Sequence, residues 1–378
     1  MSPEQFPFIV KLLDDDSPVV QEEIQRALIS VGPELPELYE RFHVAWPQRL
    51  QIHRSLWNWR KARLLSTWTQ WLRQSDPYAA LEIAHDGLSQ FASALLEGKH
   101  VVELLQEIAG LYRSERMGVA TAGDLASFLF EKRFQGDRSS YYSPDNSYLS
   151  RVIANGKGNP ISLCSLFILV GKRLGLELWG CNYPGHFLAR HDQGAELRLY
   201  DCFQGGREMD LQLTGELRGQ LSPSQVETLC RAPVSVVQII SRVVRNLVGA
   251  YLNQERRPEA NLFFLLHKDL VARDKGGVEG LTLRETLFQP GQLVVHKSKG
   301  YRGVVVDYDL YVNDSSGPTH EPVYRVLVHR SPQVASARES TLSVDPSSSL
   351  VAHPFVTYFF SKFEDGVYYR NSKPWEKP

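Results

Sequence analysis

A chain of 378 residues is long enough for two or three domains. Its content of 43% hydrophobic and 22% charged residues is ordinary for a globular protein, and a net charge of -1 gives no general reason to expect a polyanionic partner. The four cysteines lack the short paired spacing of a zinc site or disulfide framework, so we expect no metal and a reducing compartment. The N-terminus turns acidic at once, unlike a signal peptide, and no apolar run reaches membrane-spanning length. We expect a cytoplasmic protein with no membrane partner and no cofactor.

Residues 1–75 are expected to form helices joined by short turns. Ser17 and Pro18 mark a helix start, and the stretch LLDDDSPVVQEEIQRALISVG resembles one HEAT-type repeat. Residues 41–73 carry seven basic residues, five tryptophans and no acid, a composition that suits single-stranded nucleic acid. The helical spacing of Trp57, Lys61 and Trp68 favours the alternative, amphipathic helices with tryptophans packed inward.

Further helices are expected after Pro77, and a polar segment rich in turn formers then leads to Pro160. We expect this segment to be an ordered loop that Tyr141, Tyr142 and Tyr148 hold on the core.

The stretch from Asn159 to Asp201 organises the chain. Asn159 can cap the first free amides of a helix, and Pro160 fits the first helical position. Residues 161–174 are apolar almost all round, so this helix must be buried. Two strands are expected next, at residues 186–191 and 196–201. A four-residue turn between them would place His186 directly opposite Asp201. A buried helix that faces a His–Asp strand pair is the layout of a thiol-nucleophile enzyme.

The blocks NSYL, GNPISL and PGHF, in this order and spacing, resemble the SirB-type branch of the transglutaminase-like superfamily. The resemblance covers roughly residues 77–275, including a helical pair similar to a tetratricopeptide-like tail. It implies a papain-like α+β core with Cys–His–Asp chemistry, in which His186 and Asp201 are the matching histidine and aspartate.

The nucleophile is the doubtful member of this set. By position, the superfamily cysteine falls near Pro160 or Ile161, and Cys164 lies about one turn deeper, where the helix dipole has largely faded. Cys164 is therefore a buried core thiol, a displaced nucleophile or a redox site. The branch often lacks the cysteine, which fits a fold kept for binding. His186 and Asp201 would then be either an acid/base pair or a buried tie between strands.

If the domain binds rather than catalyses, a peptide or side chain would enter a groove at the N-terminus of the Pro160 helix, beside His186. The residues expected to line this groove are Asn159, Ser162 and Tyr183. The Ser162 hydroxyl is also placed to bond the helix end.

From Phe288 the sequence changes to short β-rich runs broken by glycine and proline. The blocks FQPGQLVVHKSKGYRGVVVDYDLY and PVYRVLVH resemble the YccV-like, or HspQ-type, domain, which implies a small β-barrel. That family is named for binding hemimethylated DNA, and its stand-alone members are associated with protein turnover. Lys297, Lys299 and Arg302 form a small basic patch, but residues 287–378 hold ten basic and nine acidic side chains, a balance that favours protein contact over duplex DNA.

The sequence thus predicts a multi-domain α+β protein. Its parts are a HEAT-like helical region at residues 1–75, a SirB-type transglutaminase-like domain with a helical tail at 76–283, and a YccV-like domain at 286–378. The same order of modules occurs in an F-box substrate receptor of animals, although this chain has no clear F-box.

Three functions remain open. The first is a non-catalytic adaptor that binds a protein or peptide, in protein turnover or quality control. The second is a cysteine-dependent amidase or acyltransferase that uses Cys164, His186 and Asp201. The third is a protein that binds hemimethylated DNA through the C-terminal domain.

Overall fold

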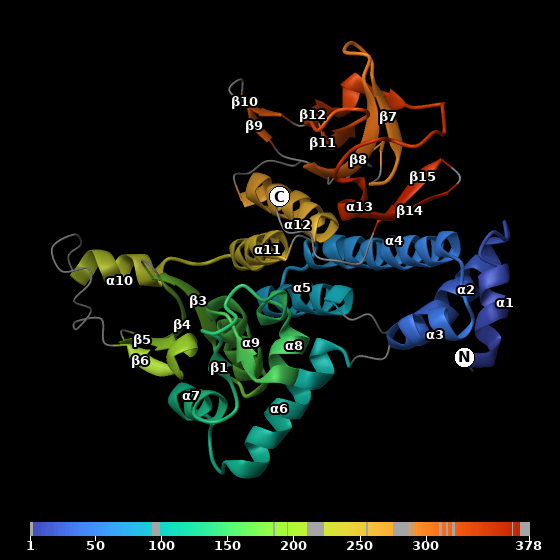
Figure 1. Cartoon of the computed structure of the whole chain (residues 1–378). Coiled ribbons are helices and arrows are strands. Elements are labelled where there is room, and N and C mark those ends of the chain that lie inside the picture. Colours follow the sequence, from blue (N-terminus) through green and yellow to red (C-terminus); the bar gives the residue numbers. More distant parts are fainter. Residues whose placement is uncertain are drawn as a thin grey trace. The chain divides into compact units, whose positions relative to one another are not determined.

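The computed structural model (Figure 1) describes residues 3–92, 99–183, 186–194, 196–209, 223–254, 256–274, 287–288, 290–309, 312–314, 317–319, 322–364 and 366–370. The chain divides into two compact units, residues 1–246 and 247–378. Helices and a mixed core make up the first unit, and the second contains a small antiparallel sheet, so the predicted α+β fold class is confirmed. None of the helices in the described ranges combines the length and apolar character needed to cross a bilayer.

The first unit begins with helices, as predicted for residues 1–75. The first of them share a hydrophobic core that includes Phe6, Leu28 and Ile52. The helices of this region and the next are α1 (Phe6–Lys11), α2 (Pro18–Ser30), α3 (Leu35–Arg41), α4 (Trp46–Trp71) and α5 (Pro77–Ala92).

Helix α4 explains the tryptophan-rich basic stretch. Trp68 and Trp71 are buried and meet edge to face, with ring centroids 5.4 Å apart. Arg60 donates two hydrogen bonds to the carbonyl oxygen of Phe91 on α5, and the ring of Trp57 packs against the same phenylalanine. Trp57 and Arg60 therefore join α4 to α5, and Trp68 and Trp71 pack inward as the amphipathic interpretation predicts.

The middle of the chain forms a four-stranded antiparallel sheet in the order β3-β4-β5-β6 and a group of helices around α9. Every residue of α9 from Ile161 to Gly171 is buried, which confirms the predicted buried helix. Helix α9 contacts α5, α6, α7 and α8 as well as β3 and β4. The elements are α6 (Val101–Glu115), α7 (Ala122–Phe130), β1 (Gln135–Gly136), α8 (Leu149–Asn155), β2 (Lys157–Gly158), α9 (Pro160–Arg173), β3 (Leu178–Tyr183), β4 (His186–Gln193), β5 (Glu196–Asp201), β6 (Arg207–Met209) and α10 (Pro223–Arg231).

The register of the β4–β5 hairpin differs from the prediction. Gln193 pairs with Glu196, and Ala189 pairs with Tyr200, so two residues rather than four separate the strands. Gly194 lies there at φ 64°, the left-handed conformation that two-residue hairpin loops require. The prediction that His186 lies directly opposite Asp201 is therefore wrong. A shift by two positions keeps both residues on the same face, where they are diagonal neighbours.

The polar segment before α9 is ordered, but its tyrosines do not all pack inward. Tyr148 is buried, whereas Tyr141 and Tyr142 are 43% and 65% exposed. The loop is held by polar contacts instead, since the Nδ2 atom of Asn146 donates to the carbonyl oxygen of Ser140. The expectation that Tyr141 and Tyr142 anchor the loop is wrong.

The second unit contains the predicted small β domain. Its main sheet has five antiparallel strands in the order β12-β11-β8-β7-β13, and the pairings among the described residues do not join β12 to β13. Alternate residues of β8 enter two cores: Val304 packs with Phe360 and Tyr368, and Val305 with Tyr324. The strands and short helix are β7 (Leu293–His296), β8 (Arg302–Asp309), β9 (Val312–Asp314), β10 (Gly317–Thr319), β11 (Val323–Val328), β12 (Val334–Arg338), β13 (Leu342–Val344), α13 (Val356–Phe359), β14 (Phe360–Glu364) and β15 (Val367–Arg370).

The predicted helical tail is present as α11 (Val236–Asn253) and α12 (Arg257–Asp274), and the boundary between the two units falls within α11. Helix α12 contacts strand β8 of the second unit, where Asn261 donates to the carbonyl oxygen of Tyr308. The rings of Tyr251 and Phe263 stack between the two helices. In the structure, α12 thus lies in the same unit as the β domain.

A buried histidine in α5 makes stability depend on pH. His85 has no solvent exposure, and neither ring nitrogen has a hydrogen-bond partner in the described part of the chain. Burial lowers its pKa from 6.5 to about 4. Between these values the unfolded chain binds a proton that the folded chain excludes. The folded state therefore loses stability as the pH falls through this window, and the contribution is complete above it.

We expect the free energy of unfolding to fall by up to about 1.4 kcal/mol per pH unit from this group alone. His85→Leu should remove that part of the slope, and His43→Asn, a change at an exposed histidine, should retain it. Urea titrations read by tryptophan fluorescence measure the slope. Equal slopes for wild type and His85→Leu would contradict the assignment.

Candidate functional site

The N-terminus of α9 is closed by its own side chains. The Oδ1 atom of Asn159 accepts hydrogen bonds from the backbone nitrogens of Ile161 and Ser162, each at 3.0 Å, which confirms the predicted cap. Its Nδ2 atom donates to the hydroxyl of Ser147 at 2.9 Å. Asn159 is 3% exposed, so its amide group is used inside the protein.

Ser162 completes this network. Its hydroxyl donates to the carbonyl oxygen of Asn146 at 2.7 Å and accepts from the backbone nitrogen of Asn159 at 3.1 Å. Ser162 is fully buried. The groove residues predicted at the helix tip thus have their polar atoms in contact with the preceding loop rather than with solvent.

His186 and Asp201 approach each other across the hairpin. The Nδ1 atom of His186 lies 3.9 Å from Oδ2 of Asp201, a separation that is longer than a hydrogen bond. The other carboxylate oxygen of Asp201 accepts from the backbone nitrogens of Phe203 and Gln204, and so caps the short helix η4 (Cys202–Gln204). The His186 side chain is 38% exposed, whereas the Asp201 side chain is 4% exposed. A buried carboxylate thus stands behind an accessible imidazole.

The cysteine of the predicted triad points elsewhere. Cys164 is fully buried, and its Sγ atom donates to the carbonyl oxygen of Phe187 at 3.5 Å. All four cysteines lie in the described ranges, and none of them hydrogen-bonds to His186. The structure brings the histidine and the aspartate together without a thiol at the imidazole.

The four buried cysteines form two pairs, Cys164 with Cys202 and Cys181 with Cys230. Burial, together with a hydrogen bond to Cys164, raises the pKa of the Cys202 thiol. A hydrogen bond with Cys230, together with burial, raises the pKa of the Cys181 thiol. These two thiols therefore stay protonated at neutral pH. Among the described residues, no group of three or more His, Cys, Asp or Glu side chains is arranged to hold a metal ion.

Tyr183, the remaining predicted groove residue, packs edge-on against the His186 ring with centroids 6.1 Å apart. It is 6% exposed, and its hydroxyl has no hydrogen-bond partner in the described ranges. The Oδ1 atom of the adjacent Asn182 is also buried without a partner there. Of these two atoms, only the Tyr183 hydroxyl belongs to a side chain that packs on the imidazole, because successive side chains of a strand point to opposite faces.

Of the three residues predicted to form the basic patch in the second unit, Arg302 is used in contacts within the domain. Arg302 donates from Nε to Asp345 at 2.8 Å and from its other guanidinium nitrogens to the carbonyl oxygens of Ser349 and Leu350. Lys297 donates to the carbonyl oxygen of Ser340 at 2.7 Å. Arg302 is therefore part of the domain's own structure, which leaves Lys297 and Lys299 as the cations of the patch.

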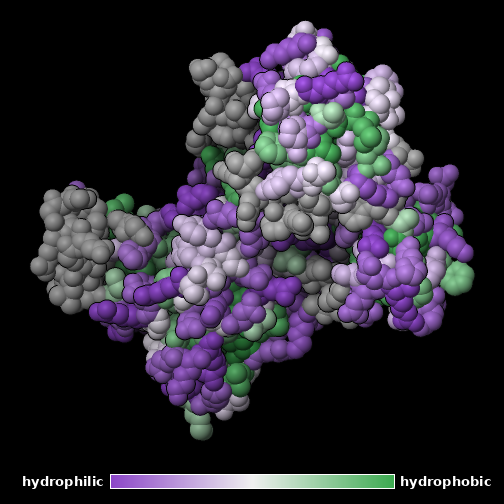
Figure 2. All heavy atoms as spheres, in the orientation of Figure 1, coloured by the Kyte–Doolittle hydropathy of each residue, from purple (hydrophilic) through white to green (hydrophobic). Residues whose placement is uncertain are grey.

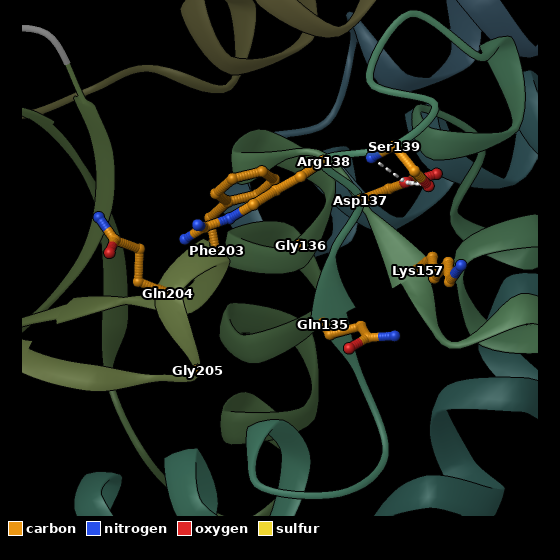
Figure 3. Close-up of a pocket in the computed structure, with 9 residues that line it drawn as sticks. All are labelled: Gln135, Gly136, Asp137, Arg138, Ser139, Lys157, Phe203, Gln204 and Gly205. Atoms are coloured by element: carbon orange, nitrogen blue, oxygen red, sulfur yellow. Dashed lines mark hydrogen bonds between the residues drawn. The ribbon is translucent and has the colours of Figure 1, made fainter.

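A pocket of about 460 Å³ lies beside η4, directly after Asp201 (Figure 3). Sequence reasoning missed it because three separate segments form it, and no single segment carries a recognisable motif. Its lining residues are Gln135, Gly136, Asp137, Arg138, Ser139, Lys157, Phe203, Gln204 and Gly205.

Residues 98–245 match the family described as the transglutaminase-like superfamily, and residues 286–367 match the hemimethylated DNA-binding protein YccV-like family. The first match contains α9 and the His186–Asp201 pair, and the second contains the five-stranded sheet. The chain carries a transglutaminase-like domain followed by a YccV-like domain. The resemblance predicted from the sequence blocks is confirmed.

Curated relatives fall into two groups. A UPF0162 protein of Xylella fastidiosa is 36% identical over 135 residues, which cover 34% of this chain and 48% of the relative. A UPF0162 protein of Pseudomonas aeruginosa is 30% identical over 183 residues, 46% of this chain and 64% of the relative. F-box only protein 21 of Homo sapiens is 24% identical over 332 residues, 64% of this chain and 52% of the relative, and has the same two-domain arrangement.

The chain spans about half the length of the first curated relatives it matches, 48% and 51% for two of them. No solved structure shows a significant match to the chain.

The cap of α9 gives a test of how strongly the transglutaminase-like domain depends on its buried polar network. We expect Asn159→Ala to lower the free energy of unfolding by about 2 kcal/mol, because it removes a cap and leaves buried amides unpaired. The exposed Asn155, on α8, provides the matched control, and Asn155→Ala should cost less than about 0.5 kcal/mol. Urea denaturation measures both. A similar small effect of the two substitutions would mean that the cap does not hold the domain together.

Proposed function

We propose that this chain is a non-catalytic binding protein whose transglutaminase-like domain receives a peptide segment of a protein partner beside His186. The observation that carries the proposal is the position of Cys164. Its sulfur is fully buried and donates to the Phe187 carbonyl, while His186 presents its imidazole to solvent. A nucleophile must reach both the substrate and its base, and a buried thiol bonded to the backbone reaches neither.

What remains accessible suits recognition. The His186 imidazole is half-exposed, backed by Asp201 and flanked by Tyr183. The Tyr183 hydroxyl beside it is buried and has no hydrogen-bond partner among the described residues, so a ligand that reaches it would gain a hydrogen bond. An extended peptide carries such hydrogen-bonding groups on its backbone.

We further propose that the protein acts as an adaptor in protein turnover. F-box only protein 21 is similar over most of the chain and has both domains, which supports a role in bringing proteins together. The chain's four free thiols support a reducing compartment, the cytoplasm.

Alkylation distinguishes this proposal from a cysteine-dependent amidase or acyltransferase. We expect native protein to gain no adduct from iodoacetamide near neutral pH, since all four thiols are buried. The same protein in urea should gain one adduct on each cysteine. Intact-mass measurement counts the adducts. A fast native adduct on Cys164 that His186→Ala abolishes would instead establish a working nucleophile.

DNA binding is the second candidate function, because the YccV-like family is named for it. The ion pairs within this domain argue against DNA binding. Arg302 is bound to Asp345, Arg325 to Asp307 and Lys362 to Glu364, so these cations are already paired. Duplex recognition needs several phosphate-neutralising side chains on one face.

We expect the full chain to bind hemimethylated and unmethylated duplexes equally weakly at physiological salt. The double substitution Lys297→Glu plus Lys299→Glu should leave the affinity for both duplexes unchanged. Fluorescence anisotropy of labelled duplexes measures this. Tight, methylation-dependent binding that the double variant abolishes would favour DNA as the ligand of this domain, provided that the control Lys362→Glu retains it.

A further inference from the structure

The pocket beside η4 is built by close approach of three segments. Strands β1 and β2 pair in parallel, Gln135 with Lys157 and Gly136 with Gly158. A Cβ atom at Gly136 would lie 2.6 Å from the ring and the carbonyl oxygen of Phe203, so only glycine lets η4 pack there. The backbone amides of η4 are held by the Asp201 carboxylate. One wall of the pocket is thus fixed to the His186–Asp201 pair.

The pocket is cationic. Arg138 and Lys157 are exposed, and neither has an ion pair or side-chain hydrogen bond within the described part of the chain. In Figure 3, Arg138 lies by Phe203 and Gln204, and Lys157 lies on the side away from Gln204. Both cations thus line the same pocket.

The lining also contains one carboxylate, Asp137, which holds a loop. The Oδ1 atom of Asp137 accepts hydrogen bonds from the backbone nitrogens of Ser139 and Ser140 and from the Ser139 hydroxyl. Its Oδ2 atom accepts from Asn146. Hydrogen bonding from the Ser140 backbone lowers the Asp137 pKa. The carboxylate therefore stays ionised, but it is buried and faces the loop that it holds, and with Arg138 and Lys157 it gives the lining a net charge of +1.

Exposed aromatic rings continue from the pocket. The Phe203 ring meets Tyr141 edge to face at 6.2 Å, and Tyr141 meets Tyr142 at 5.3 Å. The two tyrosines are 43% and 65% exposed. On the face shown in Figure 2 the surface is mostly hydrophilic, with hydrophobic residues in small patches. Aromatic side chains grouped beside a cationic pocket are typical of protein recognition.

We propose that this pocket binds an acidic side chain of a peptide segment in a protein partner, while the neighbouring apolar residue of the peptide packs on Tyr141 and Tyr142. The proposal rests on the binding function inferred above and names the chemistry of the partner. A volume of about 460 Å³ accommodates one or two side chains. The lining holds two cations and one buried carboxylate, and this net charge of +1 suits one anionic group, whereas a nucleic acid strand needs a longer positive track.

The test uses the full chain and fluorescein-labelled peptides of the pattern Gly-Glu-Leu-Glu-Gly. Matched peptides carry glutamine, phosphoserine or lysine in place of glutamate, and a labelled single-stranded oligonucleotide is the last probe. We expect saturable binding of the glutamate peptide that weakens with salt, and none of the glutamine or lysine peptides. Stronger binding of the phosphoserine peptide would identify phosphate as the preferred source of the anion.

Charge reversal locates the site. Arg138→Glu plus Lys157→Glu should weaken binding at least about tenfold. Arg116→Glu plus Arg151→Glu, the same charge change at exposed positions in the same domain, should leave it within about twofold. Hydrogen exchange should show that the peptide protects residues 135–142. Equal binding by both variants, preference for the oligonucleotide, or no saturable binding of any acidic peptide would overturn the proposal.

The adduct count after native alkylation of the same preparation reports separately on the proposed function. A reactive Cys164 together with a binding pocket would overturn the non-catalytic reading and retain the anion site. An inert Cys164 with no peptide binding would retain the non-catalytic function and overturn the anion site.

Discussion

The structure depends on one constraint: a helix that is apolar on all sides must bury its N-terminus and still satisfy the amides there. Asn159 meets this requirement for α9 by accepting from Ile161 and Ser162, and Ser162 ties the same turn to the loop at Asn146. In a thiol enzyme, free amides and the dipole at a helix tip stabilise a thiolate. Here the side chain of Asn159 already uses those amides. The feature that makes the helix stable also removes the electrostatic support for a nucleophile.

The position of Cys164 follows from this arrangement. One turn into α9, its surroundings are the packed interior, and its hydrogen bond goes to the backbone of β4 rather than to the imidazole one residue earlier. Asp201 likewise has a structural task, because one of its oxygens caps η4. That cap fixes Phe203 and Gln204, which line the pocket. The aspartate that would orient a catalytic histidine therefore also shapes a recognition surface.

Local sequence signals predicted the elements whose causes are local. The Asn159–Pro160 start, the burial of α9 and the inward tryptophans Trp68 and Trp71 each follow from residues within one helix. The hairpin register was not predictable at this level, because both a two-residue and a four-residue turn place His186 and Asp201 on the same face. The left-handed conformation of Gly194 goes with the two-residue turn. A glycine in the sequence is compatible with either turn, because glycine adopts both positive and negative φ.

Site residues were harder to predict because their roles depend on distant partners. Arg302 appears as a phosphate-binding cation in a lysine-rich hairpin, yet its partner is Asp345, 43 residues further along. Arg138 and Lys157 could not be recognised as a pair from the sequence, because a turn-rich loop and a helix separate them. The pairing of β1 with β2 brings them to one pocket.

Tyr141 and Tyr142 were expected to be buried, because aromatic residues in a loop suggest packing, but they are exposed. Asn146 and Asp137 hold that loop through hydrogen bonds, so the two tyrosines remain exposed beside the pocket. Side chains that the fold does not need for its own stability are the ones left available for a partner.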